Sequence, residues 1–186
     1  YCGMETGSDL ILRKINKGFD AATIIISGTK AKEAGMVLSE FTLFGIGGKE
    51  LAEENAVETA KVLNVIKPDF VRVHATGIKL SSEMWNYVKN KELTLQSEEE
   101  IVSEQKIMLE LLADDMDCIY MNEHIVNLLL EVRGNIRTDK QNMLETINTY
   151  LQLPKQEQEL FNLGRRLNIM FFLADLNNRA KRKQTE

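Results

Sequence analysis

The chain has 186 residues, 44% hydrophobic and 27% charged, which is the composition of an ordinary globular protein able to build a hydrophobic core. Its formal net charge of −5 argues against a general nucleic-acid-binding protein, since such proteins carry a basic excess. The two cysteines, Cys2 and Cys118, lie too far apart in sequence for a disulfide framework or a metal site, so we expect a reducing cytoplasmic location. No apolar run is long enough to cross a membrane.

The first 35 residues predict a strand followed by two helices. Tyr1–Glu5 has the character of a strand. Ser8 offers a hydroxyl as N-cap for a short helix that we expect to end at Gly18. Asp20 can cap the next helix, and Gly35 can end it. A β-branched run at positions 23–26 would also suit a strand, but the two end signals favour the helix.

The next 40 residues alternate between strand and helix patterns. Met36–Phe44 is a dense apolar run that predicts a buried strand, and it ends in the glycine turn Gly45–Gly48. Residues 52–66 have apolar side chains at helical spacing, and Pro68 ends that helix. Phe70–Ala75 predicts another strand. The order strand, helix, helix, strand, helix, strand is typical of parallel βα units.

Beyond residue 82 the sequence predicts helices alone. We expect them at Glu98–Leu112, Glu123–Glu131, Lys140–Leu151 and Gln156–Arg182. This change of pattern divides the chain into βα units at 1–82 and an α-helical extension at 83–186.

The alternation of side chains along the two later strands predicts a polar pocket. One face of the last strand is apolar and would contact the helices. The polar residues of both strands are then expected to share one space. There a structural Glu40–Arg72 ion pair and a ligand cavity explain the buried charges equally well. His74 lies near the C-terminal end of its strand, where such folds place ligands. The predicted pocket residues are Glu40, Thr42, Arg72, His74 and Thr76.

The glycine turn after Phe44 allows two interpretations. Glycines let the backbone approach a ligand, and free amides in such a turn can bind a carboxylate or phosphate oxygen. A glycine-rich turn between strand and helix is more commonly a tight turn without a ligand.

Three stretches together resemble the radical S-adenosylmethionine (SAM) family. Gly3-Met4-Glu5-Thr6-Gly7-Ser8-Asp9, followed by Ile15-Asn16-Lys17-Gly18, resembles the fourth strand of these proteins. Phe44–Glu50 resembles the turn of the fifth unit, although Gly47 stands where proline is usual. Phe70–Thr76 would be the sixth strand. The resemblance covers residues 1–82. The stretch Asn122-Glu123-His124 more loosely resembles a helical extension in some members.

The resemblance implies a TIM-like partial (βα)6 barrel, of which this chain would be the C-terminal half. In that family a [4Fe-4S] cluster, held by a C-x3-C-x2-C motif, reduces SAM to a 5′-deoxyadenosyl radical. This sequence lacks the motif and begins with Tyr1 inside a predicted strand. We therefore expect a fragment of an iron–sulfur enzyme that is inactive and binds no cofactor by itself. The resemblance does not identify the substrate.

The resemblance also suggests which residues form the site, none of them a metal ligand. The cofactor contacts would be Glu5, Thr6, Ser8, Gly45, Ile46, Gly47, Gly48 and His74. For the substrate pocket, strand alternation predicts Glu40, Thr42, Arg72 and Thr76, and the looser resemblance adds His124.

Two further expectations concern partners and function class. A partial barrel exposes a sheet edge, which predicts a homodimer. The alternative function is a non-catalytic βα and helical binding module, in which the glycine turn holds an anion such as phosphate or the helices hold a partner.

Overall fold

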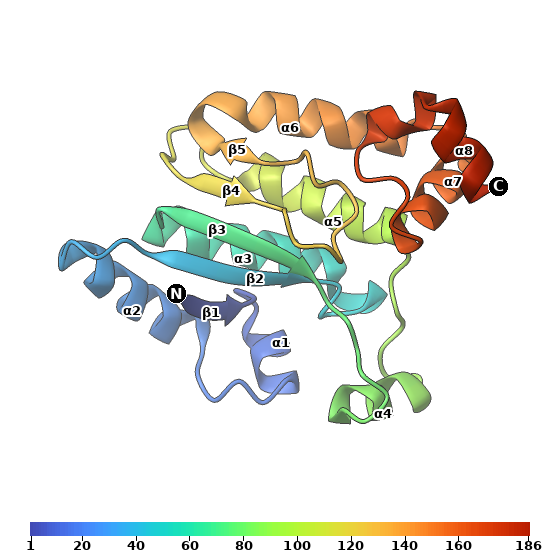
Figure 1. Ribbon diagram of the computed structural model, residues 1–186. Coiled ribbons are helices and arrows are strands. Elements are labelled where there is room, and N and C mark those ends of the chain that lie inside the picture. Colours follow the sequence, from blue (N-terminus) through green and yellow to red (C-terminus); the bar gives the residue numbers. More distant parts are fainter.

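A five-stranded sheet forms the centre of the computed structural model, which describes residues 1–186 (Figure 1). The strand order in the sheet follows the order in the chain. The first four strands are parallel, and the fifth is antiparallel to its neighbour. The strands are β1 (Cys2–Glu5), β2 (Ser39–Phe44), β3 (Phe70–Ala75), β4 (Ile119–Met121) and β5 (Gly134–Asn135). The predicted α/β class with parallel strands is confirmed.

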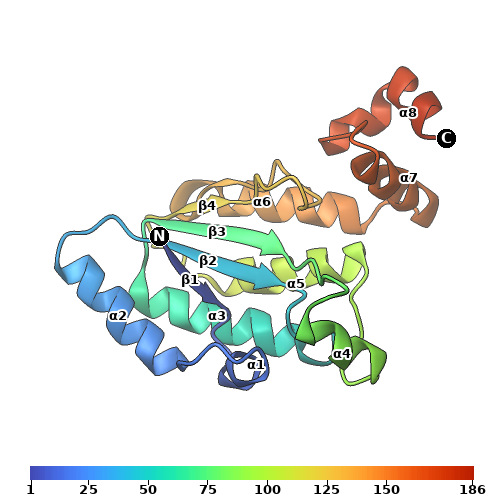
Figure 2. The same ribbon diagram turned by 60° about the horizontal axis from the view of Figure 1, so that its bottom comes forward.

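Eight α-helices and two 3₁₀ segments complete the fold. The helices are α1 (Asp9–Lys14), α2 (Ala21–Glu33), α3 (Ala52–Ile66), α4 (Glu83–Lys89), α5 (Glu98–Leu111), α6 (Ile136–Leu151), α7 (Lys155–Arg166) and α8 (Arg179–Thr185). The 3₁₀ segments are Lys49–Leu51 and Leu173–Asn177. Helices α2, α3 and α5 lie along one face of the sheet, and α6 continues this row beside α5 (Figures 1 and 2). The opposite face of β1–β3 carries no helix.

Local sequence signals fix several helix ends. Ser8 and Asp20 act as the predicted N-caps, accepting hydrogen bonds from the amides of Ile11 and Thr23. Ser97 and Glu100 form a reciprocal capping box at the start of α5. Helix α1 is shorter than expected and ends at Lys14 rather than near Gly18.

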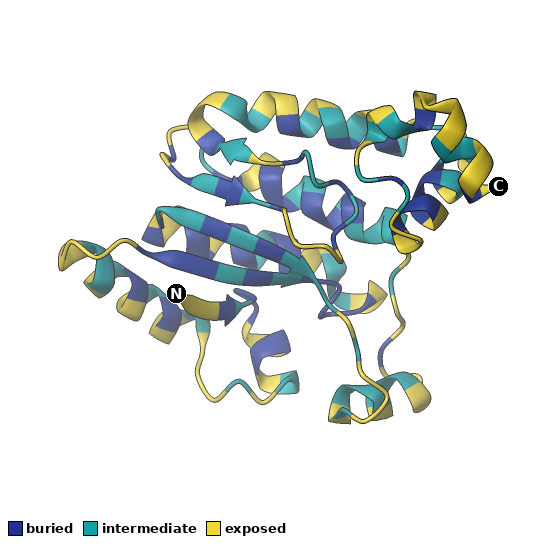
Figure 3. Ribbon diagram, in the orientation of Figure 1, coloured by how far each residue is buried: buried dark blue, intermediate teal, exposed yellow.

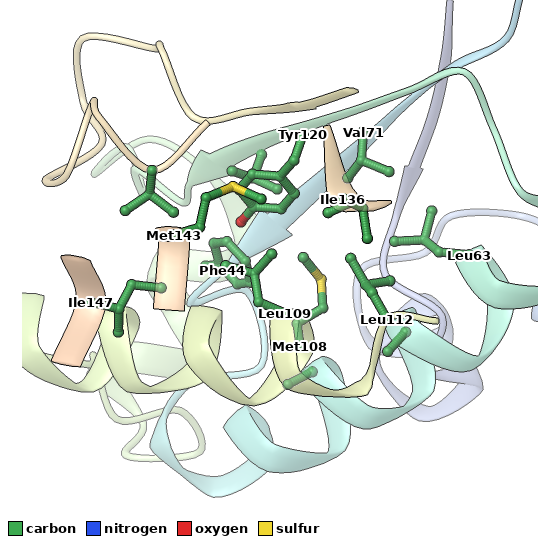
Figure 4. Packing of buried hydrophobic residues seen from close by; sticks show 14 of the residues in the cluster. Phe44, Leu63, Val71, Met108, Leu109, Leu112, Tyr120, Ile136, Met143 and Ile147 are labelled. Carbon is green, nitrogen blue, oxygen red and sulfur yellow. The ribbon is translucent and has the colours of Figure 1, made fainter. Parts of the chain in front are cut away.

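One hydrophobic core of 28 buried residues joins the sheet to the helix layer. Figure 4 shows Phe44, Val71 and Tyr120 of the sheet facing Met108 and Leu109 of α5. Burial alternates along β3, where Val71 and Val73 are fully buried and the residues between them are not (Figure 3). The core extends from β1 to the C-terminal helices, so it crosses residue 82 without a break.

The region after residue 82 is not wholly helical, which corrects the prediction. Strands β4 and β5 extend the sheet there. No helix forms at residues 123–131, because asparagine side chains in that loop bond to main-chain groups that a helix or strand would use. The long helix expected at 156–182 is interrupted at Asn168, whose φ of 57° lies in the left-handed region.

Among the helices, none combines the length and the apolar character needed to cross a bilayer.

Candidate functional site

The pairing of β2 with β3 separates two residues that the sequence analysis placed together. Glu40 is opposite Val71, and Arg72 is opposite Phe41. Paired residues of neighbouring strands point to the same face, and successive residues point to opposite faces. Glu40 and Arg72 therefore lie on opposite faces of the sheet. The predicted ion pair between them is wrong, because the register shifts the polar positions of the two strands by one residue.

Glu40 and Thr42 belong to the face covered by helices. Both side chains are buried, and the Glu40 Oε2 and Thr42 Oγ1 atoms have no hydrogen-bond partner. Burial raises the pKa of Glu40 to about 7, and the nearby Glu5 carboxylate also acts in this direction. These two residues cannot line the open face with Arg72 and His74.

Arg72 lies among aromatic rings on the open face. Its guanidinium carbon is 5.5 Å from the ring centre of Tyr1, 5.9 Å from that of Phe41 and 6.0 Å from that of Phe70. Its Nε donates to the Ser39 hydroxyl at 3.2 Å. Cation–π contacts of this kind hold the guanidinium against the sheet while leaving donors free for a ligand.

The two histidines of the chain meet at the C-terminal end of β3. The rings of His74 and His124 are stacked with their centres 4.2 Å apart, and Phe41 contacts His74 edge-on at 5.5 Å. Partial burial lowers the pKa of His74, and the charges of His124 and Arg72 lower it further. His74 is therefore mainly neutral at pH 7 and can accept or donate a proton. A cavity of about 220 Å³ adjoins both rings.

Thr76, the last of the predicted pocket residues, follows β3 directly. Its amide donates to the Phe44 carbonyl at 2.8 Å. Its Oγ1 is buried and has no partner, so it could accept or donate a hydrogen bond at this end of the sheet.

The loop that carries His124 is held in place by two side chains. Asn127 donates to the Val73 carbonyl at 2.7 Å and accepts from the Ala75 amide at 2.8 Å, so it extends the ladder of β3. Arg165 of α7 donates to the main-chain carbonyls of Ile125 and Asn127. The C-terminal helices thus position His124 over the sheet.

The loop after β1 contains three of the predicted cofactor contacts. Glu5 has a left-handed φ of 63° and pairs with Lys17 at 2.8 Å. Thr6 and Ser8 are fully buried. The Thr6 hydroxyl accepts from the Ser8 amide, and the Ser8 hydroxyl donates to Glu54. The geometry gives Thr6 and Ser8 a structural role. The Glu5 carboxylate lies against Gly3, which pairs with Phe41 of the open face, and its charge acts on His74.

The glycine turn Gly45–Gly48 is buried, not open to an anion. The Gly45 amide donates to the Glu104 carboxylate at 3.0 Å. Residues 93–96 cover the turn, and a methyl group on Gly48 would be 2.9 Å from the Leu93 side chain and the Thr94 carbonyl. The prediction that the turn has free amides is therefore wrong at Gly45, because the Gly45 amide already donates to a carboxylate from α5.

One buried polar network joins the loops after β1 and β2. The Gly7 amide donates to the Thr59 hydroxyl, which is 3.4 Å from the Asn55 amide oxygen. Asn55 donates to Glu104 at 2.5 Å, and Gln96 donates to Glu104 at 2.8 Å. Burial raises the pKa of Glu104 to about 7 in spite of these hydrogen bonds. The network sets the positions of both loops at the C-terminal edge of the sheet.

Sequence reasoning missed three residues that shape this region. Phe41 alternates with Glu40 and Thr42, so the predicted polar face excludes it, and only the register with β3 shows that it lies beside Arg72. Asn127 falls inside the helix expected at Glu123–Glu131, although it and Asn122, five residues earlier, are both residues that favour loops. Glu104 lies in a charged helical stretch, and nothing in the sequence distinguishes it from its solvated neighbours.

An iron–sulfur cluster does not fit the residues of this chain. Cys2 is exposed on β1, and Cys118 is buried just before β4. No three histidine, cysteine, aspartate or glutamate side chains are grouped to hold a metal ion. The open face and its histidines could contact an organic ligand, but these 186 residues do not supply three thiolates.

Comparisons with known proteins find a likeness in fold but none in sequence. No protein-family model matches the sequence, and no curated protein matches it. The structure is similar to that of an N-terminally truncated Elp3 from the archaeon Methanocaldococcus infernus, with a TM-score of 0.51 and 18% sequence identity. The match covers 60% of this chain and 26% of the Elp3 chain. The likeness agrees with the α/β fold and its mostly parallel sheet. The chain spans about a quarter of Elp3, and at this identity the likeness concerns the fold alone.

Proposed function

We propose that this chain forms part of a radical SAM enzyme. In this proposal the open face of β1–β3 is a section of the barrel interior that contacts SAM or the substrate. The observation that carries it is the gathering of Glu5, Arg72, His74 and His124 on the helix-free face, toward the C-terminal ends of parallel strands. Ligands in folds of parallel βα units bind at those ends. The fold likeness to Elp3 supports the same assignment.

The residues of the open face would bind and orient rather than generate the radical. Arg72 presents a fixed cation suited to a carboxylate or phosphate. Neutral His74 can hydrogen-bond a hydroxyl or a ring nitrogen. When bound, the [4Fe-4S] cluster of such an enzyme supplies the electron that cleaves SAM, and its ligands would come from outside these 186 residues.

The alternative of an anion-binding glycine turn has no support in this geometry. The turn is buried, and the carboxylate of Glu104 already accepts a hydrogen bond from the Gly45 amide. An added phosphate would have to displace the Glu104 side chain from the Gly45 amide inside a buried turn.

The two histidines make the proposal measurable, because each gives a separate imidazole C2–H signal in proton NMR. Because the cluster that anchors SAM is absent from this chain, only weak binding is expected, so SAM is added up to millimolar concentration; contact with the open face should shift both signals, and the shift should saturate. Glu5→Gln should weaken the affinity about tenfold, since a lost hydrogen bond to a charged group is worth about 1.5 kcal/mol or more. The matched control is Glu53→Gln on the exposed surface of α3, which should leave the affinity unchanged. Unshifted histidine signals at millimolar SAM would contradict the proposal.

A further inference from the structure

A second cavity lies on the other side of the sheet, between its first two strands and α2. Its volume is about 320 Å³, at the lower end of the range for small-molecule sites. The side chains of Met4, Phe19 and Ile24 supply apolar walls. Glu40 lines the same cavity. We call this cavity the Glu40 pocket, and it is separate from the open face with His74 because Glu40 points to the helix side of the sheet.

Glu40 is an unsatisfied acid at this site. The residue is 2% exposed, and its Oε2 atom has no hydrogen-bond partner. A buried carboxyl without a partner destabilises a protein, so native structures almost always provide one. A ligand that donates to Glu40 would remove this cost.

Two cations act on Glu40 from nearby, the N-terminal ammonium and Lys17, and neither donates a hydrogen bond to its Oε2 atom. Lys17 also lines the pocket, but its ammonium is paired with Glu5 at 2.8 Å and lies 5.4 Å from the Phe19 ring centre. Lys17 therefore does not reach Glu40 as a hydrogen-bond donor. Burial raises the pKa of Glu40 to about 7, so a bound cation can draw the carboxyl into its ionised form at neutral pH.

We propose that the Glu40 pocket binds a primary alkylammonium group, with the ammonium at the Glu40 carboxylate and the alkyl stem between Met4, Phe19 and Ile24. Such a group combines three hydrogen-bond donors with an apolar chain. The pocket offers the matching groups, an acceptor at Glu40 and apolar walls beside it. Two sources share this chemistry: a free alkylamine, and the side chain of a lysine in an extended peptide. The proposal does not depend on the SAM assignment, because it concerns the opposite face of the sheet.

Cys2 provides a direct readout of occupancy. It lines the pocket, lies beside Glu40 in the strand register and is exposed. Cys118 is buried, and its pKa is raised to about 12 by burial, so it reacts very slowly. The rate of Cys2 alkylation by iodoacetamide at pH 7 should fall several-fold as n-pentylamine is added, and the effect should saturate. The amine is protonated at this pH and does not consume the reagent.

Two comparisons decide whether Glu40 is responsible. In wild-type protein, the neutral isostere n-pentanol should protect Cys2 at least tenfold more weakly than n-pentylamine. Glu40→Gln should lose the protection by the amine, whereas Glu53→Gln on the surface of α3 should keep it. Equal protection by the alcohol, or no protection by the amine, would overturn the proposal without reference to any variant.

A third arm separates the two sources. A short blocked peptide with one central lysine can pair with the free edge of β1 while its side chain enters the pocket. Protection at tenfold lower concentration than n-pentylamine would identify a lysine side chain as the ligand. Protection that is no better than that of the amine would identify a free alkylamine.

Discussion

Two buried glutamates have the same raised pKa but differ in their hydrogen-bond partners. Glu40 and Glu104 both have a pKa raised to about 7, and burial is the main cause in each case. Glu104 accepts hydrogen bonds from Asn55, Gln96 and Gly45, so its burial serves to fix a loop. Glu40 has no such partner on its Oε2 atom. The difference makes Glu40 the residue whose replacement should improve stability.

Glu40→Gln should make the protein more stable at high pH. The folded protein holds a proton on Glu40 up to about pH 7, whereas the unfolded chain releases it near the ordinary value of 4.5. Stability therefore falls as the pH rises through this window. Relative to pH 4.5, the free energy of unfolding at pH 8 should favour the variant by about 3 kcal/mol, as an upper value. Urea unfolding at four pH values between 4.5 and 8 measures this, and a constant difference would contradict it.

Removing one histidine should raise the pKa of the other. The pKa of His74 is lowered by burial first and by the charge of His124 second. His124→Ala uncovers the His74 ring and removes that charge, so both causes weaken. An NMR titration of the single remaining histidine signal should show a higher pKa than in the wild type. An unchanged or lower value would mean that the stacked pair does not exist in solution.

At the scale of single elements, the loop after β1 depends on the absence of a side chain at Gly7. A methyl group there would overlap the main-chain carbonyl of Glu58 on α3. Gly7→Ala should reduce the free energy of unfolding by about 1–3 kcal/mol, because backbone must move to admit it. Gly77→Ala is the matched control, since nothing lies within 4 Å of its added carbon. Equal effects of the two substitutions on a urea unfolding curve would refute this close approach.

The strands and helices of residues 1–76 were predictable because their signals are local. Caps at Ser8 and Asp20, the apolar run before Phe44 and the helical spacing at 52–66 all act within a few residues. Strand β4 escaped prediction because it has only three residues and gains its stability from pairing with β3. Which face each polar side chain occupies depends on register between strands, and this is a non-local property. The position of His74 near the C-terminal end of its strand was therefore predictable and the face of Glu40 was not, while a ligand-binding role for either stays a prediction.

Strand β1 leaves one edge of the sheet unpaired. β1 pairs with β2 on one side and has no strand on the other. Exposed edges of this kind pair readily with further strands. The expected homodimer through this edge stays a prediction, which sedimentation at several protein concentrations can test.

At the scale of the whole molecule, a single core crosses the proposed division at residue 82. Leu109 of α5 belongs to this core and is fully buried, whereas Leu111 on the same helix is exposed. Leu109→Ala should cost about 2–5 kcal/mol, and Leu111→Ala less than about 1 kcal/mol. Because the core is shared, β2 and α6 should lose hydrogen-exchange protection together. Within each variant, both elements should lose it at one urea concentration, which is lower for Leu109→Ala. Protection of β2 that outlasts that of α6 would indicate two separate units on either side of residue 82.

The order of the strands has a consequence for how this fold can be enlarged. Each parallel strand is added beside the previous one, and the series ends where the antiparallel β5 pairs with β4. The free edge of β1 runs in the same direction as its neighbours, so a further parallel strand can join there and continue the series. The open face would gain width on the side of Glu5 and Tyr1, and its histidine side would keep its present border. A protein segment that adds such a strand would approach this surface from the side of β1.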